Sequence, residues 1–345
     1  MMRGTICLFI LCLFTACSQM RFVGIETFNP AEITYPSHVG KVLIVNNTVP
    51  QLPDSGYEYK ITGVLQDTCK AYADSALFDA CRTLGEAIVE TDFFNDVLLF
   101  NENTRKDNSF LLDVKLTQEE VQALCEETGA DAVISIDRLL FNMKKEILAF
   151  SEGYVYGTID IEIKGVIRSY LPSKETPHAT IVMSDSLFWG EEAFDIRILN
   201  QLLPTPDNAL RIAGAYIGNK AHPIFVPHWD RENRWFFTGM GAHWKKASAY
   251  AAKNKWSEAL DEWSYLYENS SHWKSKAKSA ANAALAYELT GALDKALLLA
   301  TEAHNLYEKN AGENDPYTQY QHLYKETLTK RIQSEKKLTI QIGEE

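Results

Sequence analysis

The sequence predicts an α/β domain, with a mixed sheet, crossover helices and an antiparallel hairpin, followed by an all-α region of helical repeats. Two observations carry this prediction. Short apolar runs alternate with helical patterns over residues 38–192, and small and aromatic residues recur at helical spacing over residues 244–335. The chain has 345 residues, of which 46% are apolar, so it is long enough for two domains with sizeable cores.

Residues 1–16 are typical of a secretory signal peptide. Arg3 precedes an apolar run that is too short to span a bilayer, which needs about 20 residues. Residues 14–17 (Phe-Thr-Ala-Cys) resemble the bacterial lipobox, although that motif prefers Leu where this chain has Phe14. The resemblance implies cleavage before Cys17 and a lipid on its thiol. The alternative is an ordinary secretory signal with a chance cysteine at the cleavage point.

The residues after Cys17 bear on the destination of the protein. Ser18 follows the cysteine. In the lipoproteins that the sequence resembles, an acidic residue at this position is the usual retention signal. Because this chain has Ser18 instead, the resemblance implies the outer membrane. Surface-exported lipoproteins of bacteroidete-type bacteria often carry an acidic run after the cysteine, and residues 18–21 contain none. We therefore expect an outer-membrane lipoprotein of the cell envelope that faces the periplasm, with residues 17–37 as the lipid-anchored linker.

Three strands are expected in the first half of the α/β domain, which we place at residues 38–192. Short apolar runs bounded by turn residues predict buried strands at residues 41–46, 96–100 and 131–136. Helical segments separate these runs, and this order predicts parallel pairing with helical crossovers.

The two helices between these strands carry end signals. Residues 74–75 (Asp-Ser) can cap a helix that runs to about residue 90. Thr117 and Glu120 form a capping box, and the helix that it opens ends at Gly129, as is typical of a C-terminal glycine.

An antiparallel hairpin is expected to extend the sheet. Isoleucines alternate with charged residues over residues 158–168, and residues 180–188 follow after a turn. The alternation predicts a strand with one solvent-facing side. That side should carry Asp160, Glu162, Lys164 and Arg168, so we interpret Asp160 and Glu162 as surface charges, not as a catalytic pair.

Residues 129–135, placed between a helix and a strand, resemble the α/β domain of curli-secretion lipoproteins and of Tol-system N-terminal domains. The resemblance is one of topology, and fold similarity does not transfer function. The resemblance leaves open the alternative that the protein is a component of a secretion or channel complex. Such a component would need membrane-inserting hairpins. Residues 153–190 are the one candidate, and their charges make the outer face too polar for lipid.

Residues 193–243 are expected to form a helical connector. A helix is predicted at residues 207–218, followed by a segment with two prolines and several aromatic residues that suggests a packed connection. His222, His228 and Asp230 could in principle meet a metal ion. The prolines and Trp229 favour packing and hydrogen bonding for these residues.

The last region, residues 244–335, has the pattern of tetratricopeptide-like repeats. Such repeats place small and aromatic residues at fixed positions in a unit of about 34 residues. In this chain the spacing between corresponding positions of the two units is about three residues longer. The alternative is a plain helical bundle. The packing positions in the two repeats are Ala247, Tyr250, Trp256, Ala259, Trp263 and Leu266, then Ala284, Tyr287, Gly291, Leu293, Ala296, Ala300 and Ala303. Residues 315–335 can add a capping helix, and residues 336–345 form a tail.

The mature chain as a whole resembles an uncharacterised family of bacteroidete cell-envelope lipoproteins with an α/β region and C-terminal tetratricopeptide-like repeats. The likeness rests on residues 227–229 (Pro-His-Trp), on Arg234 and on the helical Ala/Tyr/Trp pattern. It implies a location and an architecture but no activity.

Three cysteines remain after the signal peptide and Cys17, namely Cys69, Cys81 and Cys125. Cys81 and Cys125 lie on apolar helix faces, where a free cysteine behaves as a small hydrophobic residue, so we expect free buried thiols. A disulfide between Cys69 and Cys81 is the alternative in an oxidising compartment. No spacing typical of zinc ligands occurs.

The sequence contains no Gly-rich phosphate loop, GxSxG elbow or HExxH pair, so we expect no catalytic, cofactor or metal site. A net charge of -12 argues against nucleic-acid partners. We expect a non-enzymatic interaction scaffold or accessory of envelope assembly. Its protein partner should dock on the concave side of the C-terminal helices, near Lys245, Ser248 and Asn282. The alternatives are the secretion component and an enzyme with a dispersed active site.

Overall fold

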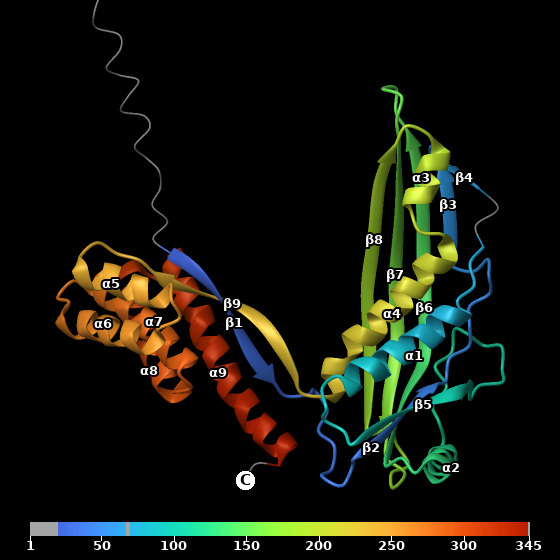
Figure 1. Cartoon of the computed structure of the whole chain (residues 1–345), viewed down its shortest axis with the longest axis horizontal. Coiled ribbons are helices and arrows are strands. Elements are labelled where there is room, and N and C mark those ends of the chain that lie inside the picture. Colours follow the sequence, from blue (N-terminus) through green and yellow to red (C-terminus); the bar gives the residue numbers. More distant parts are fainter. Residues whose placement is uncertain (1–19, 67–69, 344–345) are drawn as a thin grey trace, which may run out of the picture. The chain divides into compact units, whose positions relative to one another are not determined.

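The computed structural model describes residues 20–66 and 70–343, which form two compact units (Figure 1). The α/β unit comprises Pro30–His228, and the helical unit comprises residues 20–29 and 229–343 of the described chain. The predicted fold class is confirmed, since a mixed sheet with helices precedes an all-helical region. Within the described residues, no helix is both long and apolar enough to cross a membrane. Cys17 and Cys69 lie outside the described residues.

One sheet organises the α/β unit. The predicted parallel pairing is confirmed, because β2 pairs in parallel with both β5 and β6. The predicted hairpin is also confirmed, as β7 pairs antiparallel with β6 and β8. The described strands are β2 (Lys41–Asn46), β3 (Tyr57–Ile61), β4 (Val64–Leu65), β5 (Asp96–Asn103), β6 (Ala132–Ala149), β7 (Val155–Tyr170) and β8 (Ala179–Ala193).

Strand β6 is much longer than the predicted strand at residues 131–136. Its first part pairs with β2 and its second part pairs in parallel with β3, which continues along the same side. A register shift against β7 separates Ile136 from Arg138. Beyond this bulge one face of the strand is wet, so the apolar run ends although the strand continues.

The helices cover both faces of the sheet. Helices α1 (Asp74–Val89) and α4 (Pro206–Phe225) share one core, and α2 (Gln118–Thr128) packs on the other face (Figure 1). A short α3 (Ile196–Leu202) precedes α4. Gly214 and Gly218 of α4 allow the two helices to approach, since a Cβ atom on either would lie 2.1 Å from the carbonyl oxygen of Ala76 or Ala80. The expected connector residues 193–228 are therefore part of the α/β core.

The predicted ends of α2 are confirmed. Thr117 Oγ1 accepts a hydrogen bond from the backbone of Glu120, and the Glu120 carboxylate accepts one from the backbone of Thr117. Gly129 takes the left-handed conformation, with φ of 70°. The predicted side-chain cap of α1 is wrong, because the helix begins one residue earlier and its N-cap is Ala73, which has no side-chain acceptor.

The helical unit combines a two-stranded ribbon with five described helices. Residues 20–29, expected as part of a linker, form strand β1 and pair with β9, which begins at His228. Helices that follow one another along the chain pack against one another, so the region is a linear stack. The elements are β1 (Met20–Asn29), β9 (His228–Phe237), α5 (Ala242–Ala251), α6 (Trp256–Asn269), α7 (Trp273–Leu289), α8 (Leu293–Ala311) and α9 (Pro316–Ile342).

Candidate functional site

Strand β9 lies against the helices of the helical unit, and three consecutive aromatic residues hold it there. The ring centroid of Trp235 lies 5.9 Å from that of Tyr324 on α9. The ring centroid of Phe236 lies 5.8 Å from that of Trp263 on α6. Phe237 is completely buried. Aromatic side chains bury large apolar areas, so this extended segment is fixed firmly among the helices.

The backbone of β9 is also held directly, by Asn282 of α7. The Asn282 amide nitrogen donates to the carbonyl oxygen of Phe237 at 2.7 Å, and its amide oxygen accepts from the Phe237 N–H at 2.7 Å. Asn282 is itself completely buried. A side-chain amide can satisfy one backbone donor and one acceptor at once, which is how an extended segment is recognised regardless of its side chains.

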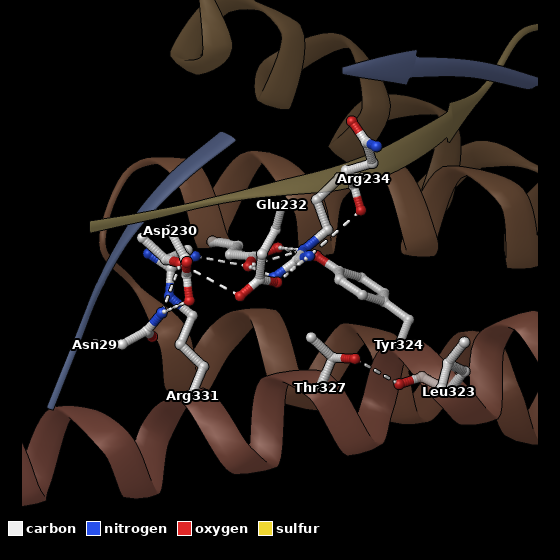
Figure 2. Close-up of polar contacts among 11 residues, drawn as sticks. Asn29, Asp230, Glu232, Arg234, Leu323, Tyr324, Thr327 and Arg331 are labelled. Atoms are coloured by element: carbon white, nitrogen blue, oxygen red, sulfur yellow. Dashed lines mark hydrogen bonds and ion pairs between the residues drawn. The ribbon is translucent and has the colours of Figure 1, made fainter. Parts of the chain in front are cut away.

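A buried charge network anchors the middle of β9 (Figure 2). Arg234 Nε lies 3.1 Å from each carboxylate oxygen of Glu288, and Arg234 Nη2 donates to Glu288 at 2.9 Å. The same carboxylate accepts from Arg331 Nη1 at 2.6 Å and from the Tyr324 hydroxyl at 2.8 Å. Glu232 adds a second carboxylate to Arg234 at 2.6 Å. Figure 2 shows Glu232 and Arg234 reaching from β9 toward Tyr324 and Arg331 of α9.

The electrostatics of this network follow from burial. Burial raises the pKa of Tyr324 well above its usual range, and the charge and hydrogen bond of Glu288 raise that pKa further. Burial alone would lower the pKa of Arg234, but hydrogen bonding and attraction to Glu288 outweigh it and the pKa is raised. The tyrosine therefore stays neutral and the arginine stays charged.

Strand β1 joins the site from the other edge of β9. Thr27 Oγ1 donates to Glu232 at 3.2 Å, and Asn29 Nδ2 donates to Asp230 at 3.2 Å. The two strands run in opposite directions, since the lower number on β1 meets the higher number on β9. We call the helix residues that hold the strand, directly or through Glu288, the β9-binding surface, and they are Trp263, Asn282, Glu288, Tyr317, Tyr324 and Arg331.

The predicted repeat residues divide into three groups. Tyr250, Trp256 and Tyr287 are half-buried. Gly291 is exposed in the turn before α8, with φ of 81°. The completely buried positions are Ala247, Ala259, Trp263, Ala284, Ala296, Ala300 and Ala303, whereas Leu293 is buried at 5% exposure and Leu266 is half-buried.

The expected lining of the concave side needs correction at one position. Lys245 is exposed and Ser248 is half-buried, but Asn282 is buried and bonded to Phe237. At Asn282 this surface is therefore occupied by the chain's own strand. The sequence pattern missed it because a segment rich in prolines, charges and aromatic residues was interpreted as a connector.

A second buried polar cluster lies in the α/β unit, where β2 ends beside Ile136 of β6. The completely buried Asp137 accepts from Asn47 Nδ2 at 2.9 Å, from Arg168 Nη1 at 2.5 Å and from the Tyr170 hydroxyl at 3.0 Å. It also accepts from the Ser135 hydroxyl. Ligands of α/β sheets commonly bind at such strand ends. Here the carboxylate already has four donors, so the cluster stabilises the bulge of β6.

The expectation that Arg168 faces solvent is wrong. Asp160, Glu162 and Lys164 are exposed, but Arg168 is buried and also donates to Asp113 at 2.5 Å. The alternation fails at this end of β7 because both faces of the sheet are covered there. The signal that could have revealed it is the pairing of a buried Asp with an Arg on the neighbouring strand.

The described residues offer little for metal or thiol chemistry. Among them, no group of three or more His, Cys, Asp or Glu side chains could hold a metal ion. Cys81 and Cys125 are buried free thiols, as predicted. Burial raises the pKa of Cys81 to about 12 and that of Cys125 to about 11, so both stay protonated and unreactive.

One cavity of about 520 Å³ opens between α8 and α9. Its lining mixes both signs of charge and includes His304, Glu308, Glu313, His322 and Lys325. Burial lowers the pKa of His304, so that side chain is neutral at physiological pH. No set of convergent groups here indicates one class of ligand.

Comparison with known families gives two matches. The family described as Domain of unknown function (DUF8603) matches residues 39–237, and the family described as Domain of unknown function (DUF6340) matches residues 245–330. No curated protein shows significant similarity to the chain. The first match ends at the last residue of β9, and the second lies within α5–α9.

Proposed function

We propose that this chain, which belongs to the DUF8603 family, is a lipid-anchored envelope protein that acts as a non-enzymatic scaffold for protein–protein contact. The observation that carries the proposal is the helical stack α5–α9, which holds an extended segment of its own chain at the β9-binding surface and leaves apolar side chains of α8 and α9 exposed. Helices that hold an extended segment by its backbone, through Asn282, are suited to binding protein chains. In the two buried polar clusters, in contrast, the central carboxylates of Glu288 and Asp137 already accept from several donors of the chain itself.

The finer parts of the proposal concern family and location. We place the protein among bacteroidete envelope lipoproteins, at the outer membrane and facing the periplasm, on the basis of the lipobox at residues 14–17 and the neutral start of the mature chain. We interpret α5–α9 as tetratricopeptide-like repeats, because alanines at the expected positions let paired helices approach closely. As in such repeats, the first helices of the pairs, α7 and α9, supply Asn282, Glu288 and Tyr324 to the extended segment.

The chain's own strand occupies this surface, so the partner must bind elsewhere on the helices. Exposed apolar side chains on the outer surface of the stack are the natural contacts, and Leu298 of α8 and Leu323 of α9 are both more than half exposed. Apolar side chains that remain exposed on a folded unit often mark an interface.

The test is co-purification from membranes. The full chain is cross-linked in cells, extracted in detergent and isolated, together with a Leu298→Glu, Leu323→Glu variant. Leu202→Glu in α3 is the matched control, because Leu202 is similarly exposed but lies in the α/β unit. We expect the same partner in fixed stoichiometry with the wild type and the control, and its loss with the double variant. A chain that always purifies alone would contradict the scaffold, and retention by the double variant would show that the partner does not dock at Leu298 and Leu323.

A further inference from the structure

Strand β1 places the proposed lipid very close to the helical unit. Residues 17–37 were expected to be a linker, but β1 begins at Met20 and is paired with β9. Only Ser18 and Gln19 separate Met20 from Cys17. Three residue steps extend by at most about 11 Å. A lipid on Cys17 therefore keeps the start of β1 within about that distance of the membrane surface.

The start of β1 lies beside the end of β9. Thr27 contacts Glu232 and Asn29 contacts Asp230, so the antiparallel ribbon brings Met20 toward the loop at residues 238–241. Met20 also packs on the core that contains Phe236, Phe237 and Trp244. We call residues 20–23 and 238–245 the ribbon end.

The ribbon end exposes large apolar side chains. Met240 is 94% exposed, the highest value among the large apolar side chains of the described chain, and Phe22 is 71% exposed. Neither packs into the cores of the unit. Exposed apolar side chains beside a lipid anchor fit the boundary between headgroups and acyl chains.

The charge around the ribbon end is opposite to that of the whole protein. The chain has a net charge of -12, yet residues 234–257 contain no Asp or Glu. The same stretch contains exposed lysines in and just after α5, namely Lys245, Lys246, Lys253 and Lys255, of which Lys246 pairs with Glu262 and Lys255 pairs with Glu258. Arg21 adds a basic side chain on β1, where the first acidic residue is Glu26. Lysines near an anionic leaflet are attracted to its headgroups.

We propose that the ribbon end is a membrane-contact surface. Phe22 and Met240 insert among the headgroups of an anionic bilayer, and Lys245 and Lys253 contact the lipid phosphates. The helical unit is then held at the membrane by a lipid and by a protein surface together. Two signals give stable attachment where a single weak one does not. The inference rests on the lipid anchor of the proposed function.

The test uses light-activated cross-linking to lipid. A benzophenone amino acid replaces Phe22, Met240 or Ile340 in the full acylated chain, which is reconstituted in vesicles of phosphatidylethanolamine and phosphatidylglycerol. Ile340 is the matched control, because it is 73% exposed in the same unit. Ile340 lies near the end of α9. Figure 1 shows that this end of α9 lies toward the end of β1, away from the start of β1. We expect lipid adducts, seen as a mass increase, at residues 22 and 240 and at least about tenfold fewer at residue 340.

The failures of the two proposals are distinguishable. A chain that carries no lipid and does not float with vesicles overturns the anchor and this inference together. A chain that is acylated and floats, but gives no more adducts at residues 22 and 240 than at 340, overturns the membrane-contact surface alone.

A charge variant tests the lysines separately. Lys245→Glu with Lys253→Glu should lower the adduct yield at Met240 by about fivefold or more, because two attractions to anionic lipid become repulsions. Lys330→Glu with Lys336→Glu, on the later part of α9, is the control and should leave the yield unchanged. Equal yields from both double variants would overturn the contribution of the lysines.

Discussion

Glu288 is completely buried, and its carboxylate is the counter-charge for two guanidinium groups. A buried ion pair contributes little net stability when it forms, because both charges lose water. Removing one partner is costly, since it leaves a charge buried without compensation. Glu288 therefore fixes the positions at which β9 and α9 pack against α7.

Glu288→Gln should destabilise the helical unit by about 3–5 kcal/mol, because Arg234 stays buried and loses its main counter-charge. Tryptophan fluorescence during urea unfolding measures this effect, since six of the seven tryptophans, all but Trp189, belong to the helical unit. Glu232→Gln is the control and should cost about 1 kcal/mol or less, because that carboxylate is partly solvated. Equal losses for the two variants would contradict the assigned role of Glu288.

Tyr324 should make the helical unit sensitive to alkali. Its pKa is raised in the folded state, whereas an unfolded tyrosine ionises near about 10. The stability that the neutral Tyr324 contributes to the folded unit is thus fully present below about pH 10 and is lost as the pH rises above that value. Tyr324→Phe should cost about 1–2 kcal/mol at neutral pH, from the lost hydrogen bond to Glu288, and should reduce the alkaline loss.

Tyr307→Phe separates the two effects of the Tyr324 substitution. Burial also raises the pKa of Tyr307, but its buried hydroxyl has no hydrogen-bond partner among the described residues. Tyr307→Phe should therefore reduce the loss of stability at alkaline pH without lowering the stability at neutral pH. Urea unfolding at about pH 8 and about pH 11 gives the comparison. An unchanged alkaline loss in both variants would show that other groups control it.

At the residue scale, the contacts of a side chain could be predicted from the sequence where its partners are close along the chain, and could not be predicted where they are distant. The capping box of Thr117 and Glu120 could be predicted because the partners are three residues apart. Asn282 and Phe237 are 45 residues apart, and nothing local reveals their pairing. Arg168 was misplaced for the same reason, since its partner Asp137 lies on another strand.

At the element scale, the contact of α1 with α4 depends on the absence of a side chain. Gly214→Ala should destabilise the α/β unit by about 1–3 kcal/mol, because the new methyl group would overlap the carbonyl of Ala76. Gly85→Ala in α1 is the matched control, since its methyl group would lie 3.6 Å from Ile44 and helix propensity favours alanine. Calorimetry of the full chain should show the loss in the first variant and not in the second. Equal effects would contradict the close approach of the helices.

Trp263 tests whether the helical stack packs as a repeat. The residue is completely buried between α6 and β9, so Trp263→Ala should cost about 3–5 kcal/mol. Trp256→Ala is the comparison, and it should cost less because Trp256 is half-buried. Urea unfolding followed by circular dichroism measures both without depending on the removed fluorophore. A smaller loss for Trp263 would show that the packing position was wrongly assigned.

Elements with strong periodicity could be predicted, and elements fixed by tertiary pairing could not. Strands β2, β7 and β8 and helices α1 and α2 could be predicted from apolar spacing, and the ends of α2 from its caps. Strand β9 was missed because its charged residues, such as Arg234 and Glu232, serve a buried network instead of solvent. Strand β1 was missed because its partner lies about two hundred residues away. Long-range pairing of this kind leaves no local pattern.

At the scale of the whole molecule, the N-terminal strand connects the proposed anchor to the helical unit. β1 and β9 pair within that unit, and β9 is in turn held by Asn282 and Glu288. A lipid on Cys17 would therefore attach directly to a folded surface and not to a long linker. The location of the protein then determines which surface of the helical unit is available to a partner.

Cys17→Ser should move the protein from the detergent-soluble membrane fraction to the soluble periplasm, because the thiol that receives the lipid is gone. Fractionation followed by immunoblotting measures the distribution, and mass spectrometry of the wild type should show the acyl chains on Cys17. Cys125→Ser is the control and should stay in the membrane fraction, since that thiol is buried in the α/β unit. The membrane-contact surface adds a second expectation. Phe22 and Met240 remain in the Cys17→Ser protein, so it should still bind anionic vesicles weakly, whereas a variant that also carries Phe22→Ser and Met240→Ser should not. If Cys17→Ser leaves the protein in the membrane fraction at the wild-type level, the anchor lies elsewhere in the chain.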